Sequence, residues 1–256
     1  MFHQITLIGT GNIGSWFCYA LTDNGFHISQ IYSRRMEHAQ ILAAQAGAEA
    51  INQLSELKDD SQIYIFALPD DHYQEVLAQI PFKMPVAIHT SGSLSQKIFK
   101  EYAVHYGVVY PFQTISKGLD FNKLEVPLLV EGDDQITEIK LLQWAQQLSH
   151  SASFQSEAQR FYLHLSAVFA SNFSNAMFHI AYKKLQEHHI DWNIMMPLLR
   201  QTVEKITLVP PIEAQTGPAS RGDVHIMKKH QAALSDDLEK EIYRLMSKYI
   251  ETEIKQ

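Results

Sequence analysis

Residues 5–17 read "ITLIGTGNIGSWF", and this stretch decides the fold of the first half of the chain. An apolar run of strand length is followed by Gly9, Gly11 and Gly14 in the spacing Gly-x-Gly-x-x-Gly, and then by helical spacing. At such a turn the first glycine permits a tight bend, the second lets the backbone approach a pyrophosphate, and the third lets the helix pack closely on the strand. Free N–H groups at the helix start then face the phosphates. The stretch therefore predicts a dinucleotide site formed by Gly9, Thr10, Gly11, Asn12, Ile13 and Gly14.

The remainder of the first half continues this alternation of short apolar runs and helical stretches. Further strands are expected at 28–33, 63–69, 85–92, 106–112 and 126–132, and helices at 15–25, 35–47 and 70–80. Strands separated by helices form a mostly parallel sheet that is covered on both faces. The pattern therefore predicts a Rossmann-like, doubly wound α/β domain.

After about residue 134 the pattern becomes helical. Helical spacing covers 135–149, 155–189, 193–207 and 230–254, without a convincing strand. The segment 149–156, "SHSASFQS", is rich in serine and is typical of a linker. We therefore expect a dinucleotide-binding domain over 1–152 and an all-helical domain over 153–256.

Composition and charge exclude several classes of protein. The chain is 46% hydrophobic and 19% charged, with a net charge of −7 and no long run of lysine or arginine, so binding to nucleic acid is not expected. The single cysteine, Cys18, cannot form an internal disulfide, and it falls within the first predicted helix, where we interpret it as a buried apolar residue. The first residues lack the basic segment of a signal peptide, so we expect the cytoplasm. The sequence predicts no metal site.

The end of the second predicted strand distinguishes between the two common dinucleotides. It reads "YSRR", with Ser33, Arg34 and Arg35 where an NAD site would place a carboxylate on the ribose 2′-hydroxyl. A carboxylate would repel a 2′-phosphate, whereas serine and arginine side chains can hydrogen-bond it. The residues favour NADP(H) over NAD(H).

The carboxyl ends of the later strands line the same crevice in a fold of this class. Leu68 and Pro69 follow one strand, and Thr90 ends the next, so we expect all three near the nicotinamide. Ser91 is a candidate for binding substrate, and His89 is a candidate acid–base group.

Residues 161–182 read "FYLHLSAVFASNFSNAMFHIAY" and form the most unusual segment of the second half. As a helix it is apolar around most of its circumference, which predicts a central buried helix, but it carries too many polar groups to cross a membrane. At about 100° per residue, His164, Ser171, Asn172, Asn175 and His179 form one polar stripe. The stripe either lines an active site or forms a hydrogen-bonded network between packed helices or at a dimer interface.

Residues 213–223 read "EAQTGPASRGD" and mark a turn between helices at Gly217 and Pro218. Arg221 and Asp223 place opposite charges beside this turn. Either they cap a helix as a local ion pair, or Arg221 points into the cleft and holds an anionic group of the substrate.

Taken together, "IGTGNIG", "YSRR", "HTSGS", "YPFQTIS", "HLSAVFASNFSN" and "QTGPASRGD" resemble the NADP oxidoreductases that pair a Rossmann-like domain with a helical domain of the DUF2520 type. More distantly, the chain is similar to the 6-phosphogluconate dehydrogenase-like superfamily, which includes ketopantoate reductase, pyrroline-5-carboxylate reductase and the β-hydroxyacid dehydrogenases. The resemblance implies NADP(H), a cleft between the domains and a homodimer formed through the helical half. Within these motifs we add Gln113 and Ser171 as candidates for binding a small-molecule substrate.

The chain departs from many β-hydroxyacid-type relatives at their Lys-x-x-x-Asn motif. The residues four positions before Asn172 and Asn175 are Val168 and Ser171, and neither is lysine. The nearest titratable group on that helix face is His164, and imidazole is suited to proton transfer at neutral pH. We hypothesise that His164 supplies a proton while Asn172 or Asn175 orients the substrate.

Two functions remain open on these residues. The first is an NADP(H)-dependent oxidoreductase that transfers hydride to or from a small polar, anionic carbonyl or imine in the interdomain cleft. The second is an NADP(H)-binding sensor or regulatory protein without redox turnover. The polar stripe and the "HTSGS" strand end favour the first, and the missing lysine favours the second.

Overall fold

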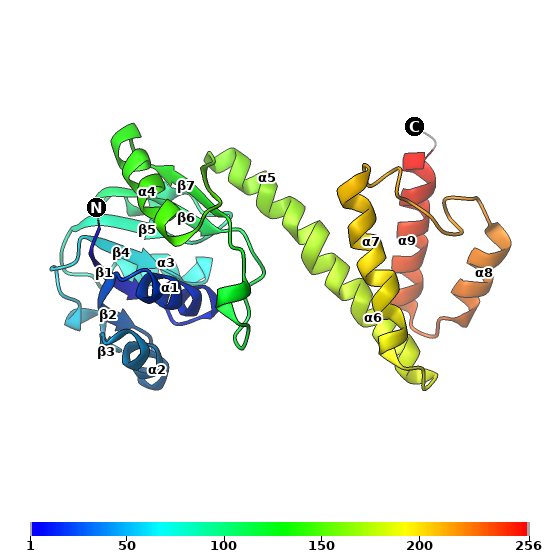
Figure 1. Ribbon diagram of the computed structural model, residues 1–256, viewed down its shortest axis with the longest axis horizontal. Coiled ribbons are helices and arrows are strands. Elements are labelled where there is room, and N and C mark those ends of the chain that lie inside the picture. The colour runs from blue at the N-terminus through cyan, green and yellow to red at the C-terminus, as the bar shows by residue number, and fades with distance from the viewer. Residues whose placement is uncertain (1, 255–256) are drawn as a thin grey trace. The chain divides into compact units, whose positions relative to one another are not determined.

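A computed structural model describes residues 2–254 of the chain, which divide after Ser171 into two compact units (Figure 1). The first unit is built on one sheet of eight strands in the order β3-β2-β1-β4-β5-β6-β7-β8. All neighbouring strands are parallel except β6 and β7. The strands are β1 (Gln4–Ile8), β2 (His27–Tyr32), β3 (Glu49–Ile51), β4 (Ile63–Phe66), β5 (Met84–His89), β6 (Ala103–Pro111), β7 (Leu128–Gly132) and β8 (Ala152–Phe154).

Helices cover both faces of this sheet, which confirms the predicted doubly wound α/β fold. Two apolar clusters form because successive side chains of a strand point to opposite faces: Leu7 belongs to one cluster and Ile8 to the other. Helices α1, α2 and α4 contribute to the first cluster and α3 to the second. The helices of this unit are α1 (Asn12–Asp23), α2 (Met36–Ala46), α3 (Tyr73–Leu77), α4 (Gln135–Leu148) and α5 (Glu157–Ala167).

Cys18 lies inside the first cluster with 1% of its surface exposed. Burial raises the pKa of its thiol to about 11, so the sulfur stays protonated at neutral pH. The side chain therefore acts as a small apolar residue of the core, as the sequence suggested.

Strand β8 corrects the expectation that no strand follows residue 134. It lies in the predicted serine-rich linker and pairs in parallel with β7. Helix α5 follows at once, beginning at a capping box in which Ser156 and Gln159 bond each other's backbone N–H groups. The first compact unit thus includes β8 and α5 with its buried Arg160, and it ends at Ser171; the domain boundary at residue 152 stays a prediction.

The second unit contains helices α6 (Ser174–Glu187), α7 (Met196–Leu208), α8 (Val224–Ala233) and α9 (Asp237–Ile254), and its described part, 172–254, has no strand. The helix expected over 230–254 is two helices. The helix is interrupted at 234–236, where the Asp236 carboxylate accepts a hydrogen bond from the Glu239 N–H and caps α9.

The helix expected over 155–189 is helical from Glu157 to Glu187 but contains a π-helical segment at Val168–Phe173. A π turn is wider than an α turn, so residues beyond it are rotated relative to those before it. The single polar stripe assumed a constant 100° per residue and is therefore not continuous across this segment. The expected burial is also wrong for the single chain, because Tyr162 and Phe169 are 67% and 63% exposed. No helix within residues 2–254 is long and apolar enough to span a membrane.

Candidate functional site

In the turn between β1 and α1, a different physical reason accounts for glycine at each of the three positions. Gly9 has φ +113°, and a Cβ there would lie 2.2 Å from the Ala67 carbonyl oxygen. A Cβ on Gly14 would lie 2.1 Å from the Gly9 carbonyl oxygen, so any side chain at either position collides with backbone. At Gly11, by contrast, a Cβ would meet no atom within 4 Å. The open space lies beside the uncapped start of α1, where free N–H groups favour an anion.

Gly11→Ala should weaken NADPH binding at least tenfold, equivalent to about 1.4 kcal/mol, without changing the thermal unfolding midpoint. The Gly11 backbone is extended (φ −69°, ψ −168°), so alanine fits the fold, and its methyl group fills only the space left for a phosphate. Fluorescence titration with NADPH and a thermal melt measure the two effects. Gly14→Ala is the matched comparison and should lower the midpoint; unchanged NADPH affinity in Gly11→Ala would show that no phosphate lies against this turn.

A cavity of about 420 Å³ adjoins the glycine turn. Its wall includes eight residues predicted to bind the dinucleotide: Gly9, Thr10, Gly11, Ser33, Arg34, Arg35, Leu68 and Pro69. His38 and His72, neither of which was predicted to bind the dinucleotide, line it as well, and Glu75 is the one carboxylate in the lining. The excess of cationic groups fits a phosphate.

The polar contacts around Ser33 show how a 2′-phosphate would be held. Ser33 is 8% exposed, and its oxygen accepts hydrogen bonds from the Thr10 hydroxyl (2.9 Å) and from the Arg35 N–H (3.4 Å). The guanidinium groups of Arg34 and Arg35 are exposed and form no ion pair with any residue of the range 2–254. They are therefore available for a doubly charged phosphate, and the residues present fit NADP(H).

His89 ends β5 in an aromatic environment, with ring centroids of Tyr73 and Phe99 at 5.9 and 5.8 Å. It is completely buried, its Nδ1 accepts the Ser91 N–H, and its Nε2 finds no hydrogen-bond partner among the described residues. Burial, with the nearby positive charge of Arg160, lowers its pKa to about 3. A histidine that is neutral and enclosed at physiological pH is a poor proton donor, so we assign His89 no proton transfer.

Ser91 belongs to the loop after β5 and uses its hydroxyl within that loop. The hydroxyl donates to the Asp70 carboxylate (3.0 Å) and accepts the N–H groups of Ser93 and Leu94. The neighbouring Thr90 is buried, and its hydroxyl bonds the Phe66 carbonyl oxygen at 3.4 Å. These bonds shape the loop, and they lend no support to a direct contact between Ser91 and substrate.

His164 lies over the carboxyl end of β6, where α5 brings it against Tyr110. The Tyr110 hydroxyl and His164 Nδ1 are 3.0 Å apart, and the two rings meet edge to face. A Cβ on Gly92 would lie 2.8 Å from His164 Nδ1 and 2.9 Å from the Tyr110 ring, so the buried loop after β5 packs directly on the pair. Sequence reasoning missed Tyr110, although it lies in the quoted "YPFQTIS".

Arg160, one helical turn before His164, fixes the start of α5 to the sheet. Its side chain is 1% exposed, forms a short ion pair with Glu131 of β7, and donates to the Leu94 carbonyl oxygen at 2.8 Å. The guanidinium thus joins α5, β7 and the loop after β5. Because residues four apart lie on one helix face, this anchor also places His164 against the sheet.

Ser171 ends the first unit, whereas Asn172 and Asn175 belong to the second and are exposed. The roles predicted for these three residues stay predictions.

Gln113 and Arg221 are the two remaining residues predicted to bind substrate. The exposed Gln113 side chain donates to the Glu125 carbonyl oxygen at 2.9 Å, within the loop after β6. Arg221 forms no ion pair with Asp223 in the described chain; Asp223 instead caps α8 by accepting the Ile226 N–H. The capping half of the sequence interpretation holds, and a substrate contact by Gln113 or Arg221 stays a prediction.

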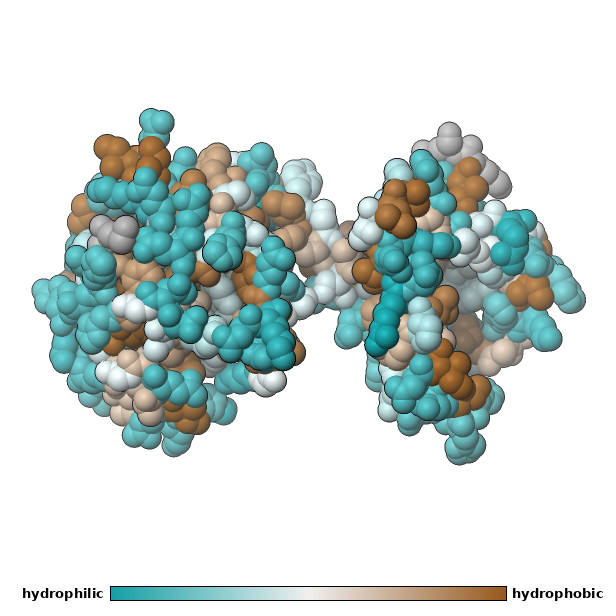
Figure 2. Space-filling model, in the orientation of Figure 1, coloured by the Kyte–Doolittle hydropathy of each residue, from teal (hydrophilic) through white to brown (hydrophobic). Residues whose placement is uncertain are grey.

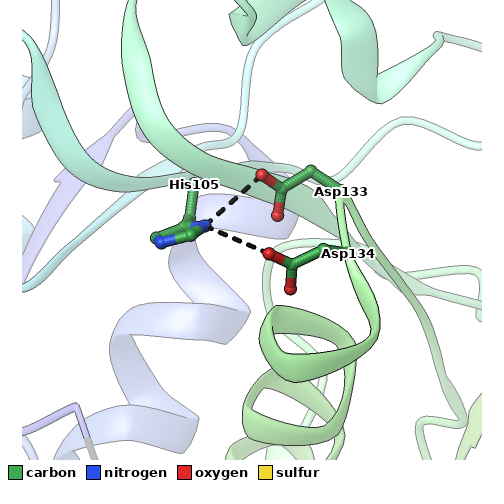
Figure 3. Close-up of side chains that lie close together, drawn as sticks. All are labelled: His105, Asp133 and Asp134. Atoms are coloured by element: carbon green, nitrogen blue, oxygen red, sulfur yellow. Dashed lines mark ion pairs between the residues drawn. The ribbon is translucent and has the colours of Figure 1, made fainter.

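One group of potential metal ligands occurs within residues 2–254, and it is remote from the glycine turn in sequence (Figure 3). His105 Nδ1 lies 3.4 Å from Asp133 Oδ2 and 3.7 Å from Asp134 Oδ2. Asp134 already caps α4 by accepting the Thr137 N–H at 2.7 Å, and about half of the His105 and Asp134 side chains is exposed. Capping and ion pairing account for the cluster, and we assign it no metal.

Both parts of the chain match known protein families. Residues 4–91 match the family described as "NADP oxidoreductase coenzyme F420-dependent", and residues 126–250 match a domain of unknown function, DUF2520. A crystal structure from Bacteroides fragilis, described as that of a candidate NADP oxidoreductase, is 34% identical, with a TM-score of 0.92 and 98% of each chain covered. No curated protein matched the chain.

Two enzymes share the fold at lower identity. The 1-pyrroline-5-carboxylate reductase of Streptococcus pyogenes is 14% identical, with a TM-score of 0.66 over 98% of both chains. An imine reductase of Myxococcus stipitatus, solved with NADP+, is 15% identical, with a TM-score of 0.63 over 98% of this chain and 93% of that one. At these identities the likeness concerns the fold alone.

Proposed function

Because this chain belongs to the NADP oxidoreductase family in which a Rossmann-like domain precedes a DUF2520 domain, we propose that it reduces a small polar carbonyl or imine with NADPH, or catalyses the reverse reaction. One observation carries the proposal. The glycine turn and the Tyr110–His164 pair both lie at the carboxyl ends of parallel strands, which is the edge where folds of this class bind their ligands.

Different residues of the first unit would bind the cofactor and transfer the proton. Gly11 and the start of α1 would hold the pyrophosphate, and Ser33, Arg34 and Arg35 the 2′-phosphate. When bound, NADPH supplies the hydride that adds to the substrate carbon. The chain must then supply a proton to the substrate oxygen or nitrogen, and His164 is the group that we assign to this transfer.

Two considerations guide the choice of substrates to test. Both enzymes named above reduce C=N compounds, as their names indicate, which makes cyclic imines the first compounds to test. An anionic substrate would use Arg221, whose guanidinium forms no ion pair within the described residues. Asn172 or Asn175 would orient the substrate, as the sequence predicts.

A binding measurement followed by a turnover screen tests the proposal. NADPH should bind about 10- to 100-fold more tightly than NADH, because the 2′-phosphate gains charged hydrogen bonds worth about 1.5–3 kcal/mol. NADPH oxidation is then followed with keto acids and cyclic imines, carboxylated and uncharged. Turnover with at least one class supports the proposal.

A non-catalytic NADP(H) sensor is the second candidate, and a specific observation favours it. Val168 and Ser171 stand where lysine would be expected in β-hydroxyacid-type relatives. Tight NADPH binding without turnover on the whole panel would favour the sensor, and no dinucleotide binding at all would contradict both candidates.

A homodimer through the helical unit would cover apolar surface that the single chain exposes. Figure 2 shows apolar side chains on the visible face of this unit, and Phe178, Tyr249 and Leu245 are 40%, 60% and 50% exposed. Sedimentation equilibrium should give twice the chain mass; a monomer at micromolar concentration would contradict the dimer.

A further inference from the structure

We propose that Tyr110 acts through His164 as the source of the transferred proton: its O–H donates to Nδ1 while Nε2–H gives its proton to the substrate. This inference rests on the proposed function, because it assigns His164 the proton transfer to substrate. It goes further by naming a second residue, a direction for each proton and a pH dependence.

The first step is the direction of the hydrogen bond between Tyr110 and His164. A phenol is a stronger acid than a neutral imidazole N–H, and an imidazole nitrogen is a stronger base than a phenol oxygen. At the observed 3.0 Å, the neutral pair therefore forms O–H···Nδ1. Burial raises the pKa of Tyr110 above its ordinary value, while the charge of Arg160 opposes this effect, so the phenol keeps its proton at neutral pH.

The second step is that the ring of His164 cannot exchange its two nitrogens freely. The backbone of Gly92 lies so close to Nδ1 and Cγ that an added Cβ would be 2.8 Å from either atom. Turning the ring over would also break the bond to Tyr110. Nε2 is consequently the nitrogen left for substrate, and no described residue hydrogen-bonds it.

The third step is the balance of the reaction. Bound NADPH would supply the hydride for the carbon of the C=O or C=N bond, which would leave the electron pair of that bond on oxygen or nitrogen. That atom takes the Nε2 proton, and Nδ1 takes the phenol proton, so His164 stays neutral and Tyr110 becomes a phenolate. The guanidinium of Arg160 opposes the effect of burial, which raises the pKa of Tyr110, and in this way favours the phenolate. The cycle closes when solvent returns a proton to Nε2 and the Nδ1 proton passes back to the phenolate.

Each charged group around the pair is held by a partner. Arg160 pairs with Glu131, and Glu157 accepts a hydrogen bond from the Ser95 hydroxyl. The Asp70 carboxylate accepts hydrogen bonds from the hydroxyls of Ser91 and Ser93. Carboxylates and guanidinium groups ordinarily keep their charge above pH 6.

Kinetics of Tyr110→Phe test the relay against a purely structural role. Without the phenol, only a protonated imidazole can donate, so kcat of the variant should fall as the pH rises, with a limiting slope of about tenfold for each pH unit. Wild type should stay nearly constant over the same range, so the ratio of the two kcat values should grow with pH. An equal loss at every pH, or parallel profiles, would overturn the relay. Tyr106→Phe, on the same strand and without a hydrogen bond to its hydroxyl among residues 2–254, is the matched control.

A second measurement needs neither substrate nor turnover. Nitrogen-15 NMR at pH 8 should show wild-type His164 with its proton on Nε2, and a mixture of both tautomers in Tyr110→Phe. The loss of signal in His164→Gln identifies the residue among the 13 histidines. A proton on Nδ1 in wild type, or no change in the variant, would overturn the inference. If the tautomers behave as expected but no substrate turns over, the proposed function fails and the hydrogen-bonded pair stands.

Discussion

Replacement of His164 by glutamine is expected to lower kcat for NADPH-dependent reduction about 10²- to 10⁴-fold, the usual contribution of a general acid. Glutamine keeps a polar side chain of similar reach but cannot pass a proton from Tyr110 to the substrate. The dissociation constant of NADPH should change little, because the glycine turn and the Ser33 pocket do not include position 164. Initial rates and fluorescence titration on one preparation measure both quantities.

His105→Gln is the matched control for this experiment. His105 is the third residue of β6, at the end of the strand opposite to Tyr110, and pairs with Asp133. It should leave kcat within about twofold of wild type, since it lies outside any group assigned to proton transfer. If His164→Gln retained full kcat, the assignment of the proton to His164 would be wrong.

Arg160→Ala is expected to destabilise the first unit by about 3–5 kcal/mol, because removing one partner leaves the other charge buried and unpaired. Arg160 is 1% and Glu131 13% exposed, and the Leu94 carbonyl oxygen would lose its donor as well. Denaturant unfolding followed by tryptophan fluorescence measures the loss. Trp144 is buried in the core of this unit and reports on it.

A double variant separates the ion pair from general packing. Replacing Arg160 by Met and Glu131 by Leu removes both charges together, so most of the lost stability should return. A loss below about 1 kcal/mol in Arg160→Ala would contradict the buried anchor, as would a double variant no more stable than the single one.

The fold of the first unit could be predicted because its signals are local. The spacing of the glycines indicates a tight turn, where Gly9 and Gly14 have no room for a Cβ, and β4 (IYIF) is a continuous apolar run. β3 and β8 could not be predicted in this way. Each has three residues, too few for periodicity, and each forms because a neighbouring strand offers free backbone groups.

The candidate site was predictable on the cofactor side and only partly on the side of the proton transfer. Ser33, Arg34 and Arg35 follow from their place at a strand end, and the cavity gathers them. His89 looked equivalent to His164 in sequence, because burial depends on the packing of Phe99 and Tyr73 and leaves no local mark. Tyr110 was missed for the same reason: its role depends on a contact with a residue 54 positions away.

The π-helical segment Val168–Phe173 was also beyond sequence reasoning. A π turn inserts into a helix without changing its composition, so apolar spacing cannot reveal it. This is why a stripe drawn with one fixed angle joined His164 to residues that follow the turn. Roles for Asn172 and Asn175 therefore stay predictions.

The most direct test of the account follows the hydride itself. NADPH deuterated at its transferable position is incubated with the protein and cyclic imines or keto acids, and the products are analysed by mass spectrometry. The account predicts one deuterium on the reduced carbon of at least one product, with the label lost from the cofactor in equal amount. Bound NADPH that keeps its full label against the whole panel would contradict it.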